Sequence, residues 1–285
     1  MRKTFAVAAA IGLSLMFGAS ASAQLPPGFK KQELTKISDS VYSFRNMFHR
    51  TWFMVTDDGV IVADPISEGA AKAMLAEIRK VTDKPVKYLL YSHEHGDHAS
   101  GGQVFRDAGA TLVSHAGCVE HMKAPGQTAA TLTWKGAHVI TLGGKSVEMF
   151  NFGPSHGNCM AVMRIPSEKL GFIVDIVSPG SVAFKTMRES DPDNWIATLR
   201  KIEAMDFDRF IPGHGPPTAP KSAVTAKREY LELLTSSVKM ALAMGKDPAS
   251  LATDGTFAKY AKWRGYKDWV PMNIDRMVRW HKDGK

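Results

Sequence analysis

The order of apolar segments along the chain predicts an α/β fold. In the first half, a strand pattern at 60–63 is followed by a helical pattern over 68–81 and a second strand pattern at 86–91, which is a β-α-β order. From Val139 onward, short strand patterns return before a longer helical one. In both halves, predicted strands run into loops that carry histidine or aspartate. With 285 residues, 44% of them hydrophobic, the chain can bury a substantial core.

Three strand patterns open the domain as a meander. They are rich in β-branched and aromatic residues and span 41–44, 52–55 and 60–63. The sequence Asp57-Asp58-Gly59 predicts the turn between the last two. The connecting segment 45–51 is expected to form either a mobile lip over a cleft or ordinary sheet.

The remaining elements follow in order. Apolar residues at helical spacing predict a helix over 68–81, and Pro85 ends the connection to the strand at 86–91. A helix over 99–108 and a strand over 110–114 come next. The second half is predicted to contain a helix over 195–205, helical structure from Lys221 onward, and short strands at 139–142, 147–152, 160–165, 170–174 and 210–211.

The first 23 residues have the pattern of a secretory signal peptide. Arg2 and Lys3 precede an apolar run, and Ala21-Ser22-Ala23 fits a cleavage site. An uncleaved anchor is the alternative. Residues 24–285 are then expected to form a single domain that is periplasmic or secreted and has no stable membrane anchor. In that oxidising setting, Cys118 and Cys159 either pair or remain apolar thiols.

The charge balance gives little indication of a macromolecular partner. Lys and Arg total 36 against 28 Asp and Glu, for a net charge of +8. The basic residues are scattered, without a run of five, which favours a solvated surface over a nucleic-acid site. We therefore expect a small-molecule substrate and no nucleic acid.

The segment His93-Glu94-His95-Gly96-Asp97-His98 concentrates metal-ligand side chains in six residues. In a loop that leaves a strand, the first two histidines can point to one side while Asp97 and His98 turn to the other, which predicts two metals. Mixed nitrogen and oxygen ligands without cysteine favour zinc or another first-row divalent metal. A histidine-rich surface turn is the alternative. The predicted ligands over the whole chain are His93, His95, Asp97, His98, His156, Asp175 and His214.

Seven ligands suit two zinc ions that share one carboxylate. Such a pair would acidify a water to a hydroxide nucleophile and polarise the carbonyl group under attack. Asp97 is predicted to be catalytic, because its carboxylate is best placed to take and relay the proton of the nucleophile.

These motifs resemble those of the metallo-β-lactamase superfamily over about residues 41–217. The similar segments are Ser92 to His98, Gly153-Pro154-Ser155-His156-Gly157, Phe172-Ile173-Val174-Asp175 and Ile211-Pro212-Gly213-His214-Gly215. The resemblance implies a four-layer αββα sandwich with the metals at the sheet edges. It assigns the first zinc to His93, His95 and His156. It assigns the second zinc to Asp97, His98 and His214, with Asp175 as the bridge. Asp64 would brace the metal loop, or simply form a turn.

The resemblance also narrows the function. Zinc β-lactamases carry Cys or Ser where this chain has Asp175, so the chain is more similar to the thioesterase, lactonase and phosphodiesterase branches. We therefore expect an exported hydrolase of carbonyl esters, lactones, thioesters or strained amides. The alternatives are a β-lactamase, a mononuclear-iron oxidoreductase similar to persulfide dioxygenases, and a catalytically silent metal-binding protein.

Other polar residues have two possible roles. Lys185 and Arg188 follow Asp175 and either anchor a substrate carboxylate or are solvated. The remaining histidines are expected at the surface, except that His115 ends a strand and could face the cleft; they are His49, His115, His121, His138 and His281.

Overall fold

Two β-sheets form the centre of the protein. The computed structural model describes residues 30–284, so the predicted signal peptide lies outside the described residues. The first sheet is antiparallel from β1 to β4 and parallel from β4 to β7. Its strands follow the order of the chain: β1 (Gln32–Lys36), β2 (Val41–Asn46), β3 (His49–Val55), β4 (Val60–Ala63), β5 (Val86–Leu90), β6 (Thr111–His115) and β7 (Leu132–Trp134).

The second sheet is antiparallel except where β11 pairs with β12. Its spatial order is β13 (Ala219–Pro220), β12 (Arg209–Pro212), β11 (Leu170–Ile173), β10 (Val162–Ile165), β9 (Lys145–Phe150) and β8 (Ala137–Leu142). The short strands β1, β7 and β13 have no counterpart in the sequence prediction.

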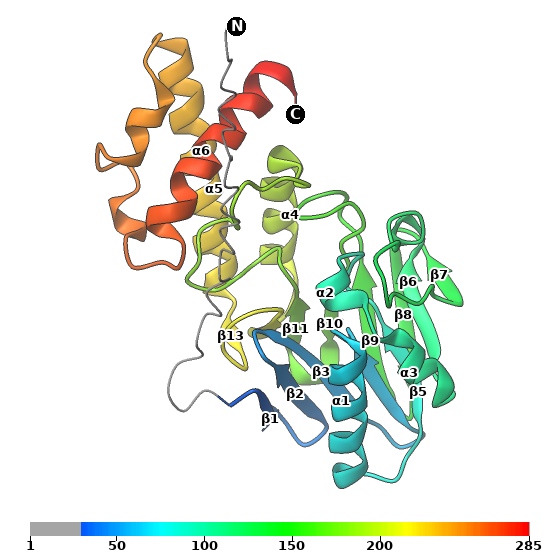
Figure 1. Ribbon diagram of the computed structural model, residues 1–285. Helices are drawn as coiled ribbons and strands as arrows, with labels where there is room; N and C mark the ends of the chain where they lie inside the picture. The colour runs from blue at the N-terminus through cyan, green and yellow to red at the C-terminus, as the bar shows by residue number, and fades with distance from the viewer. Residues whose placement is uncertain (1–29, 285) are drawn as a thin grey trace, which may run out of the picture. The chain divides into compact units, whose positions relative to one another are not determined.

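Helices cover the outer face of each sheet (Figure 1). The helices of the described residues are α1 (Glu68–Val81), α2 (Gly96–Ala99), α3 (Gly102–Asp107), α4 (Pro192–Ala204), α5 (Ser222–Ala243) and α6 (Tyr266–Asp283), the last of which packs against α5. Of these, α1 and α3 lie on the first sheet, and α4 and α5 lie on the second. Short 3-10 helices lie at Ala116–Cys118, Pro166–Glu168, Pro248–Ala252 and Ala258–Tyr260. Among residues 30–284, no helix combines the length and apolar character needed to cross a membrane.

Side chains that alternate between the two faces of each strand form this layered core. In β3, Trp52 and Met54 point into the cluster between the two sheets, whereas Phe53 points into the cluster beneath α1 and α3. Trp52 meets Phe172 of the opposite sheet edge to face, with ring centroids 6.1 Å apart. The predicted four-layer αββα sandwich is therefore confirmed.

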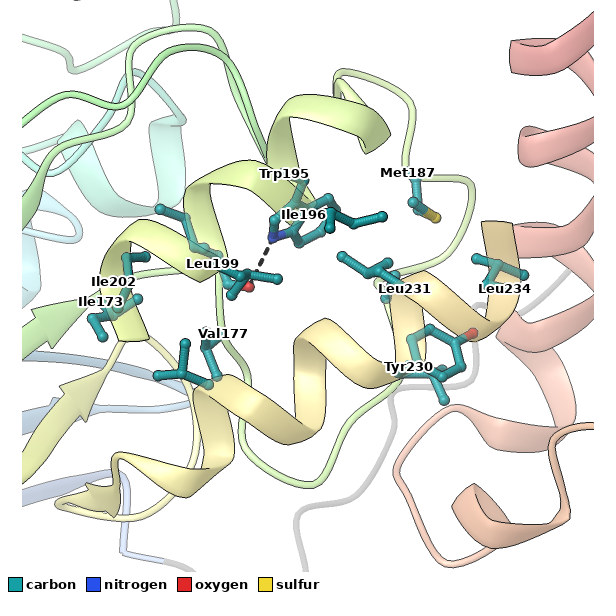
Figure 2. Packing of buried hydrophobic residues seen from close by; sticks show 14 of the residues in the cluster. Ile173, Val177, Met187, Trp195, Ile196, Leu199, Ile202, Tyr230, Leu231 and Leu234 are labelled. Atoms are coloured by element: carbon teal, nitrogen blue, oxygen red, sulfur yellow. Dashed lines mark hydrogen bonds between the residues drawn. The ribbon is translucent and has the colours of Figure 1, made fainter. Parts of the chain in front are cut away.

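A third cluster lies between the second sheet and the helices of the second half. Figure 2 shows Trp195 and Leu199 of α4 packed near Leu231 of α5, and the dashed line marks the 3.0 Å hydrogen bond from the Trp195 indole to the carbonyl of Ile176. This contact ties α4 to the segment that follows β11. The helices α5 and α6 agree with the helical structure predicted from Lys221 onward.

The helix predicted over 99–108 is wrong at its start. The helix α2 ends at Ala99, and α3 begins only at Gly102. Gly101 separates them because it adopts a φ of +91° and lies against the backbone of Ser67, where a Cβ would approach to 2.4 Å. As a result, Asp97 and His98 lie on a single helical turn rather than in an open loop.

The segment 45–51 forms sheet almost to its middle. Strands β2 and β3 stay paired up to Asn46 and His49, so only Met47 and Phe48 form the turn. The long mobile lip is therefore replaced by a tight hairpin tip, at which Phe48 is 54% exposed.

The two cysteines, whose state the sequence left open, form a disulfide. Cys118 follows β6, and Cys159 lies in the connection between β9 and β10. The bond therefore joins the first sheet to the loop that also carries His156.

Candidate metal centre

The predicted ligand loops of both sheets meet at one edge. Asp64 follows β4 and the His93 segment follows β5, and these two strands are parallel neighbours. Asp175 follows β11 and His214 follows β12, which form the parallel pair of the second sheet. Since parallel neighbours end on the same side, each sheet brings its two loops together. The connection between β9 and β10 adds His156.

The seven predicted ligands gather in two groups, and His49 is an additional member of the second group. Within each group the ligand atoms lie within 4.8 Å of one another. The first group is His93, His95, His156 and Asp175, and the second is His49, Asp97, His98 and His214.

Asp175 contacts both groups. Its Oδ2 lies 3.6 Å from Nε2 of His93 and 3.6 Å from Nε2 of His156. The same oxygen is 3.8 Å from Nε2 of His98, and Oδ1 is 3.1 Å from Nε2 of His214. One carboxylate can thus reach a cation in either group, as expected of a bridging ligand.

A hydrogen-bonded chain orients His93. Asp64 is fully buried and accepts hydrogen bonds from the amide and the hydroxyl of Ser92, at 2.7 and 2.6 Å. Because the Ser92 hydroxyl donates to this carboxylate, it must accept at 2.9 Å from Nδ1 of His93. Nε2 of His93 then carries its lone pair toward Asp175, as a metal ligand requires.

His98 and His214 are oriented in the same way. Nδ1 of His98 lies 3.4 Å from the Asp64 carboxylate. Nδ1 of His214 donates to the carbonyl of Phe48 at 2.9 Å, since a carbonyl can only accept. In the metal-ligand form of both rings the proton is on Nδ1, and the two Nε2 atoms face each other at 3.4 Å.

This donor set fits a metal. Two nitrogens bound to one tetrahedral zinc lie about 3.4 Å apart, and two facing lone pairs repel unless a cation lies between them. Nε2 of His93 and Oδ1 of Asp175 are also buried without a hydrogen-bond partner among the described residues. Such orphaned polar atoms are costly in a fold unless an ion satisfies them.

The protonation equilibria favour the metal-binding forms of His93, His156 and Asp175. Burial lowers the pKa of His93 and of His156, so both are neutral near pH 7. Burial opposes ionisation of Asp175, yet the charge of His98 and the proximity of His214 hold its pKa well below the usual range. Burial also disfavours a charged His98, but the carboxylates of Asp175 and Asp64 raise its pKa to about 9. A divalent cation would take the place of that proton.

Comparison with known proteins identifies the family. A model of the metallo-beta-lactamase superfamily matches residues 45–214. The chain belongs to this superfamily. The match covers the hairpin with His49 and every predicted ligand, and the resemblance inferred from the motifs is confirmed.

Superfamily relatives differ in their named activities. The 2,4-dinitroanisole O-demethylase subunit alpha of Nocardioides sp. is 27% identical over 180 residues, 61% of this chain and 55% of that protein. A linear primary-alkylsulfatase of Pseudomonas sp. is 23% identical, over 59% of this chain and 41% of its own. The chain thus spans about half the length of these two relatives. Metallo-beta-lactamase IND-1 of Chryseobacterium indologenes is 22% identical, over 71% of this chain and 88% of its own.

A solved superfamily structure has the same fold. The metallo-beta-lactamase from Pontibacter korlensis superposes with a TM-score of 0.64 at 19% identity, covering 70% of this chain and 99% of that one.

His49 is the one member of the two groups that the sequence assigned to the surface. It begins β3, and its Nε2 lies 3.1 Å from Oδ2 of Asp97. Its ring also meets that of His214 with centroids 4.8 Å apart. A lone histidine 44 positions before the motif carries no local signal; the pairing of β2 with β3 decides that it faces the ligands.

We expect His49→Ala to weaken metal binding at the second group by about tenfold to hundredfold, because Asp97 loses the partner that orients it and the group loses a nitrogen. Zinc affinity, measured by competition with a chromogenic chelator, tests this. His121→Ala, an exposed histidine outside both groups, is the matched control. If both metal-binding groups of His49→Ala keep the zinc affinity of the unaltered protein, a role for His49 in metal binding is refuted.

The metal-binding groups open into a cavity of about 610 Å³. The loop 178–189 forms much of its wall, and the exposed residues Lys185 and Arg188 lie on it. On the same loop, Glu189 lies 2.7 Å from Nε2 of His95, a contact that no sequence pattern indicated. His115 is not among the residues that line this cavity; it packs on Trp134 with ring centroids 5.0 Å apart.

The C-terminal helices of this superfamily member hold the loop 178–189 in place. Lys227 of α5 donates to the carbonyl of Ser181 at 2.7 Å. Asn273 and Arg276 of α6 donate to carbonyls of the same loop, at 2.6 Å to Lys185 and 3.2 Å to Met187. Segments beyond the last predicted ligand therefore shape the wall of the cavity.

Proposed function

We propose that the protein is an exported hydrolase that uses two zinc-class ions to cleave carbonyl esters, lactones, thioesters or strained amides. The observation that carries this proposal is the position of Asp175 within 3.1 to 3.8 Å of histidine nitrogens from both groups. A shared carboxylate of this kind suits two cations that act on one substrate. When bound, such ions supply a Lewis acid for the carbonyl oxygen and make a water molecule more acidic.

Residues of this chain supply the remaining chemistry. Burial would disfavour an ionised Asp97, yet the hydrogen bond from His49 and the charge of His98 hold its pKa below the usual range, so it is a carboxylate at neutral pH. It lines the cavity beside His49 and can accept the proton of the attacking water. The apolar side chains of Phe48 and Trp195 border the same space and would hold the acyl part of a substrate.

Three alternatives make different demands on the site. A mononuclear-iron oxidoreductase uses a single His-His-Asp set and leaves the four residues around His49 without a role. A silent metal-binding protein does not need a half-exposed carboxylate at Asp97. A β-lactamase is supported by the relatives of that name. Asp175, however, adds a hard anionic oxygen between the metals, which should lower their electrophilicity toward a leaving amide nitrogen.

Metal content and a substrate panel test the proposal together. We expect active protein to contain about two zinc-class ions per chain. Chelation should abolish turnover but leave the protein folded, because the three apolar clusters do not depend on the metals. Elemental analysis and circular dichroism of the same preparation measure both. Active protein with one metal or none would overturn the two-metal proposal.

The panel contains esters, lactones, thioesters, phosphodiesters and β-lactams. We expect ester-type substrates to have the higher kcat/KM, with β-lactam hydrolysis only a side reaction. A β-lactam efficiency of roughly 10⁴ M⁻¹s⁻¹ or more that also exceeds the value for every ester and lactone would favour a β-lactamase instead.

Export is part of the proposal. The pattern of residues 1–23 and the disulfide are both typical of proteins that mature outside the cytoplasm. The terminal sequence of the mature protein tests it, with Gln24 as the expected first residue.

A further inference from the structure

The wall of the cavity contains two cations that follow the matched family segment. The superfamily model ends at residue 214, whereas Lys227 belongs to α5 and Arg264 to the segment before α6. Both line the same cavity as Asp97, His156 and His214. The C-terminal part of the chain thus brings positive charge to a space that the metal-binding groups also border.

Lys227 is a buried ammonium group without a counter-ion. Only 2% of the residue is exposed, and its Nζ donates to one acceptor, the carbonyl of Ser181. The rings of Tyr230 and Trp263 lie 5.9 Å from the same nitrogen. Among residues 30–284, no carboxylate forms an ion pair with it. Burial, followed by the charge of Arg264, lowers the pKa of Lys227 to about 7.

Arg264 adds a second positive charge close by. Its backbone amide donates to the carbonyl of Gly180 at 2.9 Å, and its carbonyl accepts from Val182 at 3.2 Å, so the residue is fixed beside the loop that Lys227 contacts. The guanidinium stacks over Trp269 at 5.7 Å. In the described part of the chain it, too, has no carboxylate partner. Two cations near each other in a cavity wall repel, and an anion between them removes both that repulsion and the cost of burial.

We propose that Lys227 and Arg264 form a subsite for the negatively charged oxygen group of an organic substrate, a carboxylate or a sulfate. This deepens the proposed function, on which it rests, by naming the substrate class. The apolar part of such a substrate would extend along Val182 and Trp195, which line the cavity, toward the metal centre. The carboxylates of Asp97, Asp175 and Glu189 lie at the metal end of the same cavity and disfavour an anion there, except one that contacts the metals.

Binding of small probes tests the subsite without any turnover. Hexanoate and hexanesulfonate are the anionic probes, and hexanamide is the neutral one. Each is titrated into the protein as purified, and calorimetry measures the binding. We expect Lys227→Met to lower the affinity for both anions by about tenfold to hundredfold, since hydrogen bonds to charged groups are lost, and to leave hexanamide unchanged. Methionine has a similar length and no charge, so removal of the buried charge offsets the lost hydrogen bond to Ser181 and the melting temperature should change little.

Two further variants keep the test decisive. Arg264→Gln changes an exposed side chain and should lower the affinity for both anions several-fold. This result does not depend on whether Lys227→Met folds. Lys185→Met removes an exposed cation from the same cavity and should change anion affinity less than threefold. Equal loss of hexanamide binding in Lys227→Met would mean that Lys227 only holds the loop, which overturns the proposal. Anion binding that persists in Lys227→Met and Arg264→Gln but disappears with Lys185→Met or with chelation would also overturn it.

Failure of the hydrolase proposal remains distinguishable. If no ester is turned over but the anions bind through Lys227, the subsite stands and the reaction is wrong. If esters are turned over but Lys227→Met changes kcat/KM equally for an anionic ester and its neutral counterpart, the reaction stands and the subsite is wrong.

Discussion

Asp97→Asn is expected to lower kcat by about 10²- to 10⁴-fold while the first metal-binding group keeps its metal. Asparagine has the shape of aspartate and can still accept a hydrogen bond from His49, but it cannot take a proton from water. Because Asp97 belongs to the second group only, His93, His95 and His156 retain their metal. The amide is a poorer ligand for the second ion, so kcat must be measured at saturating zinc.

Metal stoichiometry measured on the same samples separates loss of chemistry from loss of metal. Asp107→Asn, a change at an exposed carboxylate on α3, is the matched control and should not alter kcat. A kcat within about threefold of the unaltered protein, with both metals bound, would exclude Asp97 as the proton acceptor.

Removal of the disulfide should cause the largest loss of stability. Cys118 and Cys159 are 41 positions apart, and closing a loop of this length stabilises the fold by about 4 kcal/mol through the unfolded chain. We therefore expect the double variant Cys118→Ala with Cys159→Ala to lose about that free energy of unfolding in urea. Zinc affinity of the first group should also fall, because His156 lies three residues before Cys159.

The disulfide contacts the metal loop through Glu94. The carboxylate of this buried residue accepts a 2.7 Å hydrogen bond from the amide of Asn158, beside Cys159. Without the disulfide, the His156 loop keeps this contact and the 2.9 Å hydrogen bond from the amide of Asp191 to the carbonyl of Ser155. The reduced but otherwise unaltered protein is the control, and it should lose a similar free energy. A double variant within about 1 kcal/mol of the oxidised protein would show that the covalent link contributes little.

Local sequence patterns were sufficient to predict most of the layers. The alternation in β3, with Trp52 and Phe53 on opposite faces, and the helical spacing of 68–81 are properties of neighbouring residues. The Ser67 cap, whose hydroxyl accepts from the amide of Ala70, was not predicted, although it is equally local. The break at Gly101 was not predicted, because it depends on contact with Ser67 from another part of the chain.

Some residues of the candidate site could likewise be predicted from the sequence, whereas others were found only from the structure. The clustered residues from His93 to His98, with His156, Asp175 and His214 at strand ends, could be found from ligand chemistry and spacing in the sequence alone. Tertiary structure decided that His49 joins the second group, that Cys118 reaches Cys159, and that Lys227 lies buried in the cavity wall. A lone histidine, cysteine or lysine carries no periodic signal, and its environment depends on residues distant in the sequence. Only the folded chain, in which strand pairing and helix packing bring those residues together, determines what each of them contacts.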